Sequence, residues 1–279
     1  MLIRCWGSRG SIPVSGEEYI KYGGDTTCVE ITSASGEIMI IDAGTGIRAL
    51  GNSLVRKKRS KMSLLLTHSH WDHLSGFPFF KPLYRKESKI KVWGPEVTHD
   101  SLRNLISNTM APPYFPIELE GINADISFHT IKKKSFSIGG IKIENIPLSH
   151  TNQGVGYKFT EDGKSFVFIT DNEITHQHPG GLDYRDYVKF SEGADLLFHD
   201  AEYTPADYKI TRGWGHSVYL DTLYLALEAG VKKLGLFHHN QDRTDPEIDK
   251  MVEECRSIAY DRGSGLECLA VAAGTAIEL

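Results

Sequence analysis

The sequence is poor in the features that mark secreted, membrane and zinc-ribbon proteins. Its four cysteines show no Cys-x-x-Cys spacing, so they indicate neither a zinc ribbon nor a disulfide framework. No apolar stretch approaches the roughly 20 residues that a membrane-spanning helix needs, and residues 1–7 lack the apolar core of a secretory signal. We therefore expect a cytoplasmic protein with reduced thiols and no membrane partner.

Positive charge is also scarce. The 31 Lys and Arg residues are outnumbered by 36 Asp and Glu residues, which gives a formal net charge of -5. Nucleic-acid binding depends on clustered cations, so we do not expect a surface devoted to it, although a local basic patch is compatible with this composition. A charged fraction of 24% and a hydrophobic fraction of 40% exclude a disordered chain or a coiled coil. With no repeat or linker, residues 1–279 are predicted to form one domain.

The order of apolar segments predicts an α/β protein. Short strand-like segments between Gly, Ser and Pro residues in the first third are typical of an antiparallel or mixed sheet. Strands are predicted at residues 2–6, 27–32, 37–42, 141–146, 156–160, 166–170, 195–199 and 233–237, and helices at 47–58, 102–110, 218–229 and 246–260. Asp245 is the expected N-cap of the last helix, with Pro246 at its first position. Residues 83–130 give the least legible pattern.

Four potential metal ligands follow one apolar run. Leu64, Leu65 and Leu66 lead into Thr67-His68-Ser69-His70-Trp71-Asp72-His73. Side chains two apart in an extended segment point the same way, so His68 and His70 can bind one ion while Asp72 and His73, on the following turn, reach a second. Imidazole and carboxylate ligands suit Zn²⁺, and Mn²⁺ or iron accepts the same mixture.

Further ligand types stand where later apolar strands end. His150, Asp171 and His238 each follow such a segment. A single histidine in this position is more often a structural residue, but three polar endings together with the first cluster favour a metal site. Asp171 is the natural bridge, because a carboxylate can share its two oxygens between ions about 3.5–4 Å apart. The sequence therefore predicts two divalent ions per chain.

Taken together, these motifs resemble the metallo-β-lactamase fold hydrolases, and within them the phosphodiesterase branch that includes tRNase Z and the phosphoribosyl cyclic phosphodiesterases. The matching motifs span most of the chain: Ile41-Asp42-Ala43-Gly44-Thr45-Gly46, the 67–73 cluster, His150, Thr170-Asp171, Phe198-His199-Asp200-Ala201, Gly213-Trp214-Gly215-His216-Ser217 and Phe237-His238. The resemblance implies a four-layer αββα sandwich.

The resemblance also implies roles for individual residues. It assigns His68, His70 and His150 to one ion and Asp72, His73 and His238 to the other, with Asp171 between the two ions. His216 would be a general acid held by Asp200, a position often occupied by Glu in tRNase Z. Asp72 is counted with the catalytic residues as well as with the ligands, and Asp42 would orient a ligand histidine.

The expected activity is hydrolysis of a small, cyclic phosphodiester. Water activated between the two ions would attack phosphorus, and His216 would protonate the departing alkoxide. A tRNase Z-like endoribonuclease is the main alternative, although the chain is acidic and lacks an extended basic arm. A thioester or β-lactam hydrolase would not need the Asp200/His216 pair, and a binding module with structural metals would need a closed ligand set. The sequence leaves open whether the protein forms a homodimer.

The remaining histidines are given lesser roles. Alternation along a strand turns His199 and His239 away from the neighbouring site residues, so both are predicted to be structural. His176 and His178 form a second His-x-His in a loop, and a place at the rim of the substrate site is open for them. Candidates for shaping the substrate pocket are Arg9, Asp25, Tyr114 and Phe115.

Overall fold

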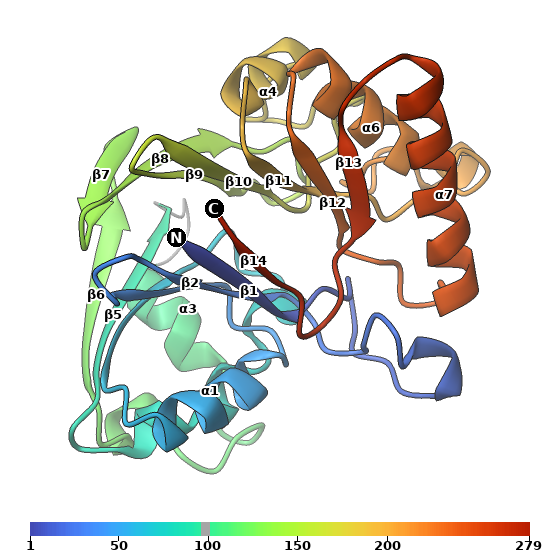
Figure 1. The fold of residues 1–279 in the computed structure, drawn as a ribbon. Coiled ribbons are helices and arrows are strands. Elements are labelled where there is room, and N and C mark those ends of the chain that lie inside the picture. The colour runs from blue at the N-terminus through green and yellow to red at the C-terminus, as the bar shows by residue number, and fades with distance from the viewer. Residues whose placement is uncertain (96–100) are drawn as a thin grey trace.

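Two seven-stranded sheets face each other in the computed structural model, which describes residues 1–95 and 101–279. In the first sheet the strand order is β14-β1-β2-β3-β4-β5-β6, and in the second it is β13-β12-β11-β10-β9-β8-β7 (Figure 1). Strands of the first sheet are β1 (Leu2–Gly7), β2 (Cys28–Thr32), β3 (Ile38–Ile41), β4 (Lys61–Leu65), β5 (Lys89–Pro95), β6 (Asp125–Ile131) and β14 (Ala276–Glu278). Those of the second are β7 (Ser135–Ile138), β8 (Ile141–Pro147), β9 (Val155–Glu161), β10 (Lys164–Ile169), β11 (Leu196–Asp200), β12 (Lys233–Phe237) and β13 (Glu267–Ala270).

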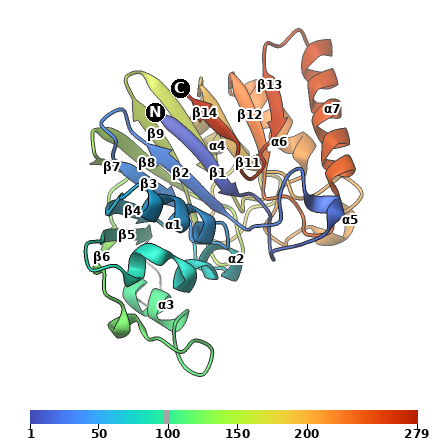
Figure 2. The same ribbon diagram turned by 60° about the horizontal axis from the view of Figure 1, so that its bottom comes forward.

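Helices cover the outer face of each sheet. The α-helices are α1 (Ile47–Arg56), α2 (Trp71–Leu74), α3 (Leu102–Asn108), α4 (Tyr184–Ser191), α5 (Tyr208–Thr211), α6 (Tyr219–Glu228) and α7 (Asp245–Asp261). Short 3₁₀ turns span Glu17–Tyr19, Phe77–Phe79, Lys81–Tyr84 and Leu119–Gly121. Helices α1 and α3 lie on the first sheet, and α4, α6 and α7 lie on the second (Figure 2). The predicted four-layer αββα sandwich is therefore confirmed.

The space between the sheets is an apolar core. Ile31 and Met39 of the first sheet and Phe159, Phe168 and Phe198 of the second belong to one buried cluster, and none of these five side chains is exposed. A second cluster lies between the first sheet and α1, and a third between the second sheet and helices α4, α6 and α7. Central strands are thus buried on both faces, which explains why they read as continuous apolar runs.

Parallel strands place polar residues at one edge of the sandwich. Strands β3, β4, β5 and β6 are mutually parallel in the first sheet, and β10, β11, β12 and β13 are parallel in the second. Carboxyl ends of parallel strands meet at the same edge of a sheet, where ligands characteristically bind. The ends of β4, β10 and β12 therefore bring the 67–73 cluster, Asp171 and His238 to one place.

Several local predictions need correction. The N-cap of α7 is Thr244, not Asp245, and the Glu247 carboxylate accepts hydrogen bonds from the Thr244 backbone N–H and hydroxyl at 2.8 Å. Asp245 instead accepts a 2.7 Å hydrogen bond from the backbone of Lys21, so its carboxylate serves the tertiary fold. The strands that the sequence did not predict are β5, β6, β7, β13 and β14, most of them near the sheet edges.

No helix in the described part of the chain is both long enough and apolar enough to cross a membrane.

Candidate metal centre and acid dyad

The loop after β4 carries four of the predicted ligands. Its backbone is fixed by Asp42, whose two carboxylate oxygens accept hydrogen bonds from the N–H and the hydroxyl of Thr67, both at 2.8 Å. The same carboxylate accepts a 2.8 Å hydrogen bond from Nδ1 of His73. Asp42 is completely buried, so this network holds the ligand loop from beneath. The structure thus identifies the ligand histidine that Asp42 orients.

Ligand atoms gather in two groups that share Asp171. One group contains His68, His70, His150 and Asp171, and the other contains Asp72, His73, Asp171 and His238. Within each group the ligand atoms lie within 4.8 Å of one another. These are the two sets that the resemblance implied, and together they contain all seven predicted metal ligands.

Asp171 divides its two oxygens between the groups. Its Oδ2 lies 3.5 Å from Nε2 of His68 and 3.7 Å from Nε2 of His150. Its Oδ1 lies 3.2 Å from Nε2 of His73 and 3.3 Å from Nε2 of His238. One carboxylate therefore faces two different histidine pairs, which is the geometry required of a bridging ligand.

Hydrogen bonds fix which nitrogen most of the histidines turn toward the centre. His73 donates from Nδ1 to Asp42, and His150 donates from Nδ1 to the carbonyl oxygen of Gly215 at 2.8 Å. The Thr67 hydroxyl donates its proton to Asp42, so its oxygen accepts from Nδ1 of His68 at 3.0 Å. In each case Nδ1 is taken up by a hydrogen bond, so Nε2 is the nitrogen that faces the centre and can bind a metal.

His70 differs because its Nδ1 faces the centre, 3.1 Å from Nε2 of His150. Its Nε2 lies 2.9 Å from the side-chain amide of Asn152. A ligand on Nδ1 requires Nε2–H to donate, which turns the Asn152 amide so that its oxygen faces His70. Burial, with the charge of His68, lowers the pKa of His70 to about 4, and burial also holds the pKa of His150 well below its ordinary value. Both rings are thus neutral, as ligands must be.

The residues present fit a pair of divalent ions. Nε2 of His68 and Nε2 of His73 are buried and have no hydrogen-bond partner among the described residues. Buried polar atoms are almost always paired, so two such atoms aimed at one carboxylate indicate a bound cation. Burial alone would raise the pKa of Asp171, but the neighbouring charges of His238 and His73 outweigh it and hold that pKa well below its usual range. Asp171 is therefore a carboxylate at neutral pH.

Three residues of the centre have strained backbones. Asp42, Asp171 and His238 have φ angles of 60°, 50° and 58°, in the left-handed region that non-glycine residues rarely adopt. Each such residue costs of order 1–3 kcal/mol and persists only where the surrounding structure enforces it. Asp42 and His238 directly follow β3 and β12, and Asp171 follows β10 after Thr170, so the backbone turns sharply where each strand ends.

The predicted dyad lies against both ligand groups. Nδ1 of His216 donates to Asp200 at 2.7 Å, and the His216 ring lies 4.7 Å from the ring of His238 and 5.1 Å from that of His150. Burial alone would lower the pKa of His216, but the carboxylates of Glu202 and Asp200 outweigh it and raise the pKa to about 9. His216 is thus protonated near neutral pH, which is the state a general acid needs.

Glu202 was missed by the sequence analysis. Its Oε2 accepts a 3.0 Å hydrogen bond from Nδ1 of His238 and lies 3.3 Å from Nδ1 of His216. One buried carboxylate therefore orients a ligand histidine and also faces the acid dyad. The available signal was its position two residues after Asp200, because side chains two apart at a strand end share a face.

Glu173 was also missed, and it supports the loop that carries His216. Its oxygens accept hydrogen bonds from the backbone N–H of Gly213 at 2.7 Å and of Gly215 at 2.8 Å. Glu173 also accepts from Nε2 of His178 at 2.7 Å. His178 therefore helps to hold Glu173 in place. His176 is half-buried, and its ring packs against the ring of His178 with the centroids 4.8 Å apart.

The residues proposed to shape the pocket have other roles. Arg9 is completely buried, and its guanidinium donates to the carbonyl oxygens of Gly23, Asn240 and Arg243. It anchors the loop beside the centre, where the backbone N–H of Ser11 donates to Asp72 at 2.9 Å. The guanidinium of Arg9 is therefore occupied in holding this loop.

The two ligand groups contain none of the remaining pocket candidates, and they contain neither His199 nor His239. Asp25 accepts a 2.8 Å hydrogen bond from the Thr45 hydroxyl. Tyr114 is 85% exposed, and Phe115 packs against Phe79. Both His199 and His239 are buried and hydrogen-bonded to backbone carbonyls, so their structural roles agree with the alternation of the strands.

Comparison with known proteins finds relatives of similar sequence and solved structures of similar fold. Ribonuclease Z from Oceanobacillus iheyensis is 22% identical, with 82% of this chain and 88% of the relative covered. Ribonuclease Z from Thermococcus kodakarensis is 25% identical, with 73% and 75% covered. Among solved structures, the metallo-β-lactamase fold protein YhfI from Bacillus subtilis superposes with a TM-score of 0.74 at 15% identity, covering 100% of this chain and 98% of that one.

A diphosphatase of the PhnP family also shares the fold, with a TM-score of 0.68 at 18% identity and with 100% and 97% of the two chains covered. These likenesses and the layer order confirm the predicted fold. The model of the Beta-lactamase superfamily domain matches residues 38–239, a span that contains every predicted ligand and both residues of the dyad. The chain therefore belongs to the β-lactamase superfamily.

Proposed function

We propose that the protein is a dinuclear metal-dependent phosphodiesterase that hydrolyses a small, cyclic phosphodiester. The observation that carries the proposal is the position of Asp171, which faces two histidine pairs while a protonated His216 lies against both. The coarser class, a metal-dependent hydrolase of phosphodiester bonds, agrees with the family and with relatives that are ribonucleases and a diphosphatase.

The ligand set defines how the site would work. When bound, Zn²⁺ or Mn²⁺ ions, with iron as a further candidate, lower the pKa of a water molecule and place positive charge beside the phosphoryl oxygens. His68, His70 and His150 would hold one ion, Asp72, His73 and His238 the other, and Asp171 both. Asp42, Glu202 and the Gly215 carbonyl keep the ligand rings oriented, so that little reorganisation is needed during the reaction.

His216 has the position and charge of a general acid. Because Nδ1 is held by Asp200, Nε2 is the nitrogen that can face the substrate. As the P–O bond breaks, the proton on Nε2 would pass to the departing alkoxide oxygen, and Asp200 would keep the ring aligned. General acid catalysis contributes typically 10²–10⁴-fold, most where the leaving group is a sugar alcohol.

Charge supports a small substrate. A polynucleotide substrate is held largely by cations that displace its counterions, and this chain has a net charge of -5 and no extended basic arm. A small diester needs only its one phosphate neutralised, which the centre itself provides. A cyclic diester also keeps its leaving oxygen tethered close to the acid.

A tRNase Z-like endoribonuclease is the second candidate, and the ribonuclease Z relatives favour it. The two candidates differ in how strongly rate should depend on salt. Binding of a small diester displaces one or two counterions, whereas binding of a precursor tRNA displaces many. The affinity for tRNA would therefore fall steeply as the salt concentration rises.

The test is a hydrolysis screen of protein loaded with Zn²⁺ or Mn²⁺. Cyclic nucleotides, cyclic sugar phosphates, linear diesters and precursor tRNA are compared at low and moderate salt. We expect the highest kcat/KM on a small cyclic diester, with a modest salt effect. Higher kcat/KM on precursor tRNA with a steep salt dependence would support the second candidate, and no hydrolysis of any diester would exclude both.

A further inference from the structure

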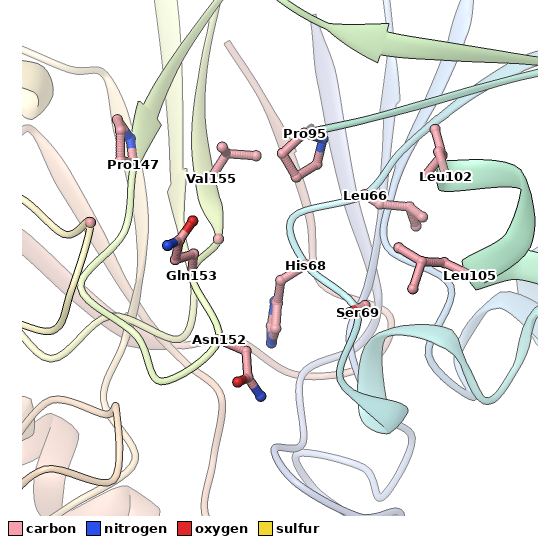
Figure 3. Close-up of a pocket in the computed structure, with 12 residues that line it drawn as sticks. Leu66, His68, Ser69, Pro95, Leu102, Leu105, Pro147, Asn152, Gln153 and Val155 are labelled. Atoms are coloured by element: carbon pink, nitrogen blue, oxygen red, sulfur yellow. The ribbon is translucent and has the colours of Figure 1, made fainter. Parts of the chain in front are cut away.

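A cavity of about 240 Å³ adjoins the metal centre (Figure 3). It lies at the ends of β4 and β5 on one side and at the junction of β8 and β9 on the other, and α3 contributes Leu102 and Leu105 to its wall. The described residues that line it are Leu66, His68, Ser69, Pro95, Leu102, Leu105, Pro147, Asn152, Gln153, Gly154, Val155 and Gly180.

The cavity and the centre share one wall. His68 lines the cavity, while its unpartnered Nε2 lies 3.5 Å from Asp171. Asn152 also lines the cavity, and its amide lies 2.9 Å from Nε2 of His70. In Figure 3 both side chains lie at the same side of the cavity. A molecule whose phosphate rests on the centre therefore has the cavity directly beside it.

The lining has a definite chemistry. Leu66, Leu102, Leu105 and Val155 supply apolar surface, and no Asp, Glu, Lys or Arg is present among the described lining residues. None of these described residues can neutralise a phosphate, and none can form an ion pair with an amine. The amide of Asn152, together with that of Gln153, can hydrogen-bond to one edge of a neutral group.

We propose that this cavity is a specificity subsite that binds a neutral ring carried by the substrate, beside the phosphate held at the centre. The inference rests on the proposed phosphodiesterase function and names the class of substrate: a phosphodiester bearing one aromatic or heterocyclic ring. Pockets for drug-sized molecules span about 300–1,000 Å³, so a cavity of this volume suits a single ring system.

Leu105 allows the subsite to be tested without disturbing the core. It is half-buried on α3 and lines the cavity, whereas its neighbour Ile106 is fully buried in the core below the first sheet. Asn104, on the other side of Leu105, is exposed. Leu105→Glu would place a charge in the cavity, Leu105→Trp would fill it, and Asn104→Glu is the matched control on the same helix.

The first measurement is binding and does not depend on turnover. The affinities of phenylphosphonate and methylphosphonate for the Zn²⁺-loaded protein are compared by calorimetry. Both ligands carry the same anionic group, so their ratio reports the ring alone. Burying a ring in an apolar cavity should favour phenylphosphonate by about tenfold or more. Leu105→Glu and Leu105→Trp should abolish this preference while methylphosphonate still binds, and Asn104→Glu should keep it.

The second measurement is hydrolysis of methyl p-nitrophenyl phosphate and phenyl p-nitrophenyl phosphate, which share one leaving group. We expect a higher kcat/KM for the phenyl ester, with the preference lost in the Leu105 variants. Equal affinity of the wild-type protein for both phosphonates, or a preference that survives both Leu105 variants, would overturn the subsite. Absence of hydrolysis with a clear phenylphosphonate preference would instead reject the phosphodiesterase function and keep the subsite.

Discussion

The carbonyl oxygen of Gly215 accepts a hydrogen bond from Nδ1 of His150 at 2.8 Å. The loop that carries His216 therefore also orients His150, which belongs to the ligand group with His68 and His70. Gly215 has a φ of 98°, and a Cβ at this position would lie 2.2 Å from that same Nδ1. The proposed general acid and a proposed metal ligand are thus linked through one backbone segment.

Gly215→Ala should displace His150 and reduce metal content at the group containing His68 and His70. Gly213→Ala is the matched control, because Gly213 also has a positive φ of 87° but a Cβ there would approach nothing nearer than 3.9 Å. Both variants should lose roughly 1–2 kcal/mol of stability from left-handed strain. Elemental analysis should show metal loss in Gly215→Ala alone. Equal metal content in the two variants would reject the coupling.

Asp171→Ala should empty both groups, since it removes the one carboxylate that faces all four nearby histidines. The control is Asp195→Ala, which removes another buried carboxylate, one that pairs with Lys232 away from the centre. We expect the control to retain both ions. An Asp171→Ala protein that retains two ions, measured by elemental analysis, would contradict a bridging role.

His216→Ala should keep both ions and lose activity in a way that depends on the leaving group. On a diester with an alkyl leaving group we expect a loss of about 10²–10⁴-fold, because the alkoxide departs without a proton. On bis(p-nitrophenyl) phosphate the loss should be much smaller, since nitrophenolate hardly needs protonation. Equal losses on the two substrates would tell against the general acid.

The pH dependence should follow the charge of His216. A general acid is active when protonated, so kcat/KM on an alkyl diester should fall as pH rises through the pKa of His216. Its carboxylate neighbours raise that pKa to about 9 against the opposing effect of burial, and bound cations would move it lower. Glu202→Gln removes one of the two carboxylates and should shift the falling limb to lower pH.

Metal content is the necessary control for Glu202→Gln, because Glu202 also orients His238. The profile is compared at full metal occupancy, and bis(p-nitrophenyl) phosphate should show no comparable limb. A limb that stays in place in Glu202→Gln would mean that the titrating group is not His216.

The seven residues that the sequence proposes as ligands come together in the structure, because local rules govern their positions. His150, Asp171 and His238 follow apolar strands, and the carboxyl ends of parallel strands must meet at one edge. The supporting acids Glu202 and Glu173 escaped notice because most of their partners lie far along the chain. His238 is 36 positions from Glu202, and Gly213 and Gly215 are 40 and 42 positions from Glu173. Their contacts depend on tertiary packing, and the only local signal was the spacing of Glu202 from Asp200.

Asp245 and Arg9 both have roles that depend on tertiary contacts and not on their neighbours in the sequence. Asp245 has the right residue type for an N-cap, but tertiary contacts with the backbone of Lys21 take its carboxylate. Arg9 was expected to help shape the substrate pocket, and nothing in the sequence indicates that this arginine is one of the few that are fully buried. Three backbone carbonyl groups satisfy its guanidinium, and these come from segments near residues 23 and 240 that only the fold brings together.

The two ligand groups draw on both sheets: His68 through His73 follow β4 of the first, and His150, Asp171 and His238 come from the second. Bound ions would therefore clamp one half of the sandwich to the other, and unfolding would have to release them. At a free metal concentration 100 times the dissociation constant, such linkage adds about 2.7 kcal/mol per site. The melting temperature should then rise steadily with added Zn²⁺ or Mn²⁺ and fall with a chelator, so that a simple thermal scan would rank the ions by affinity.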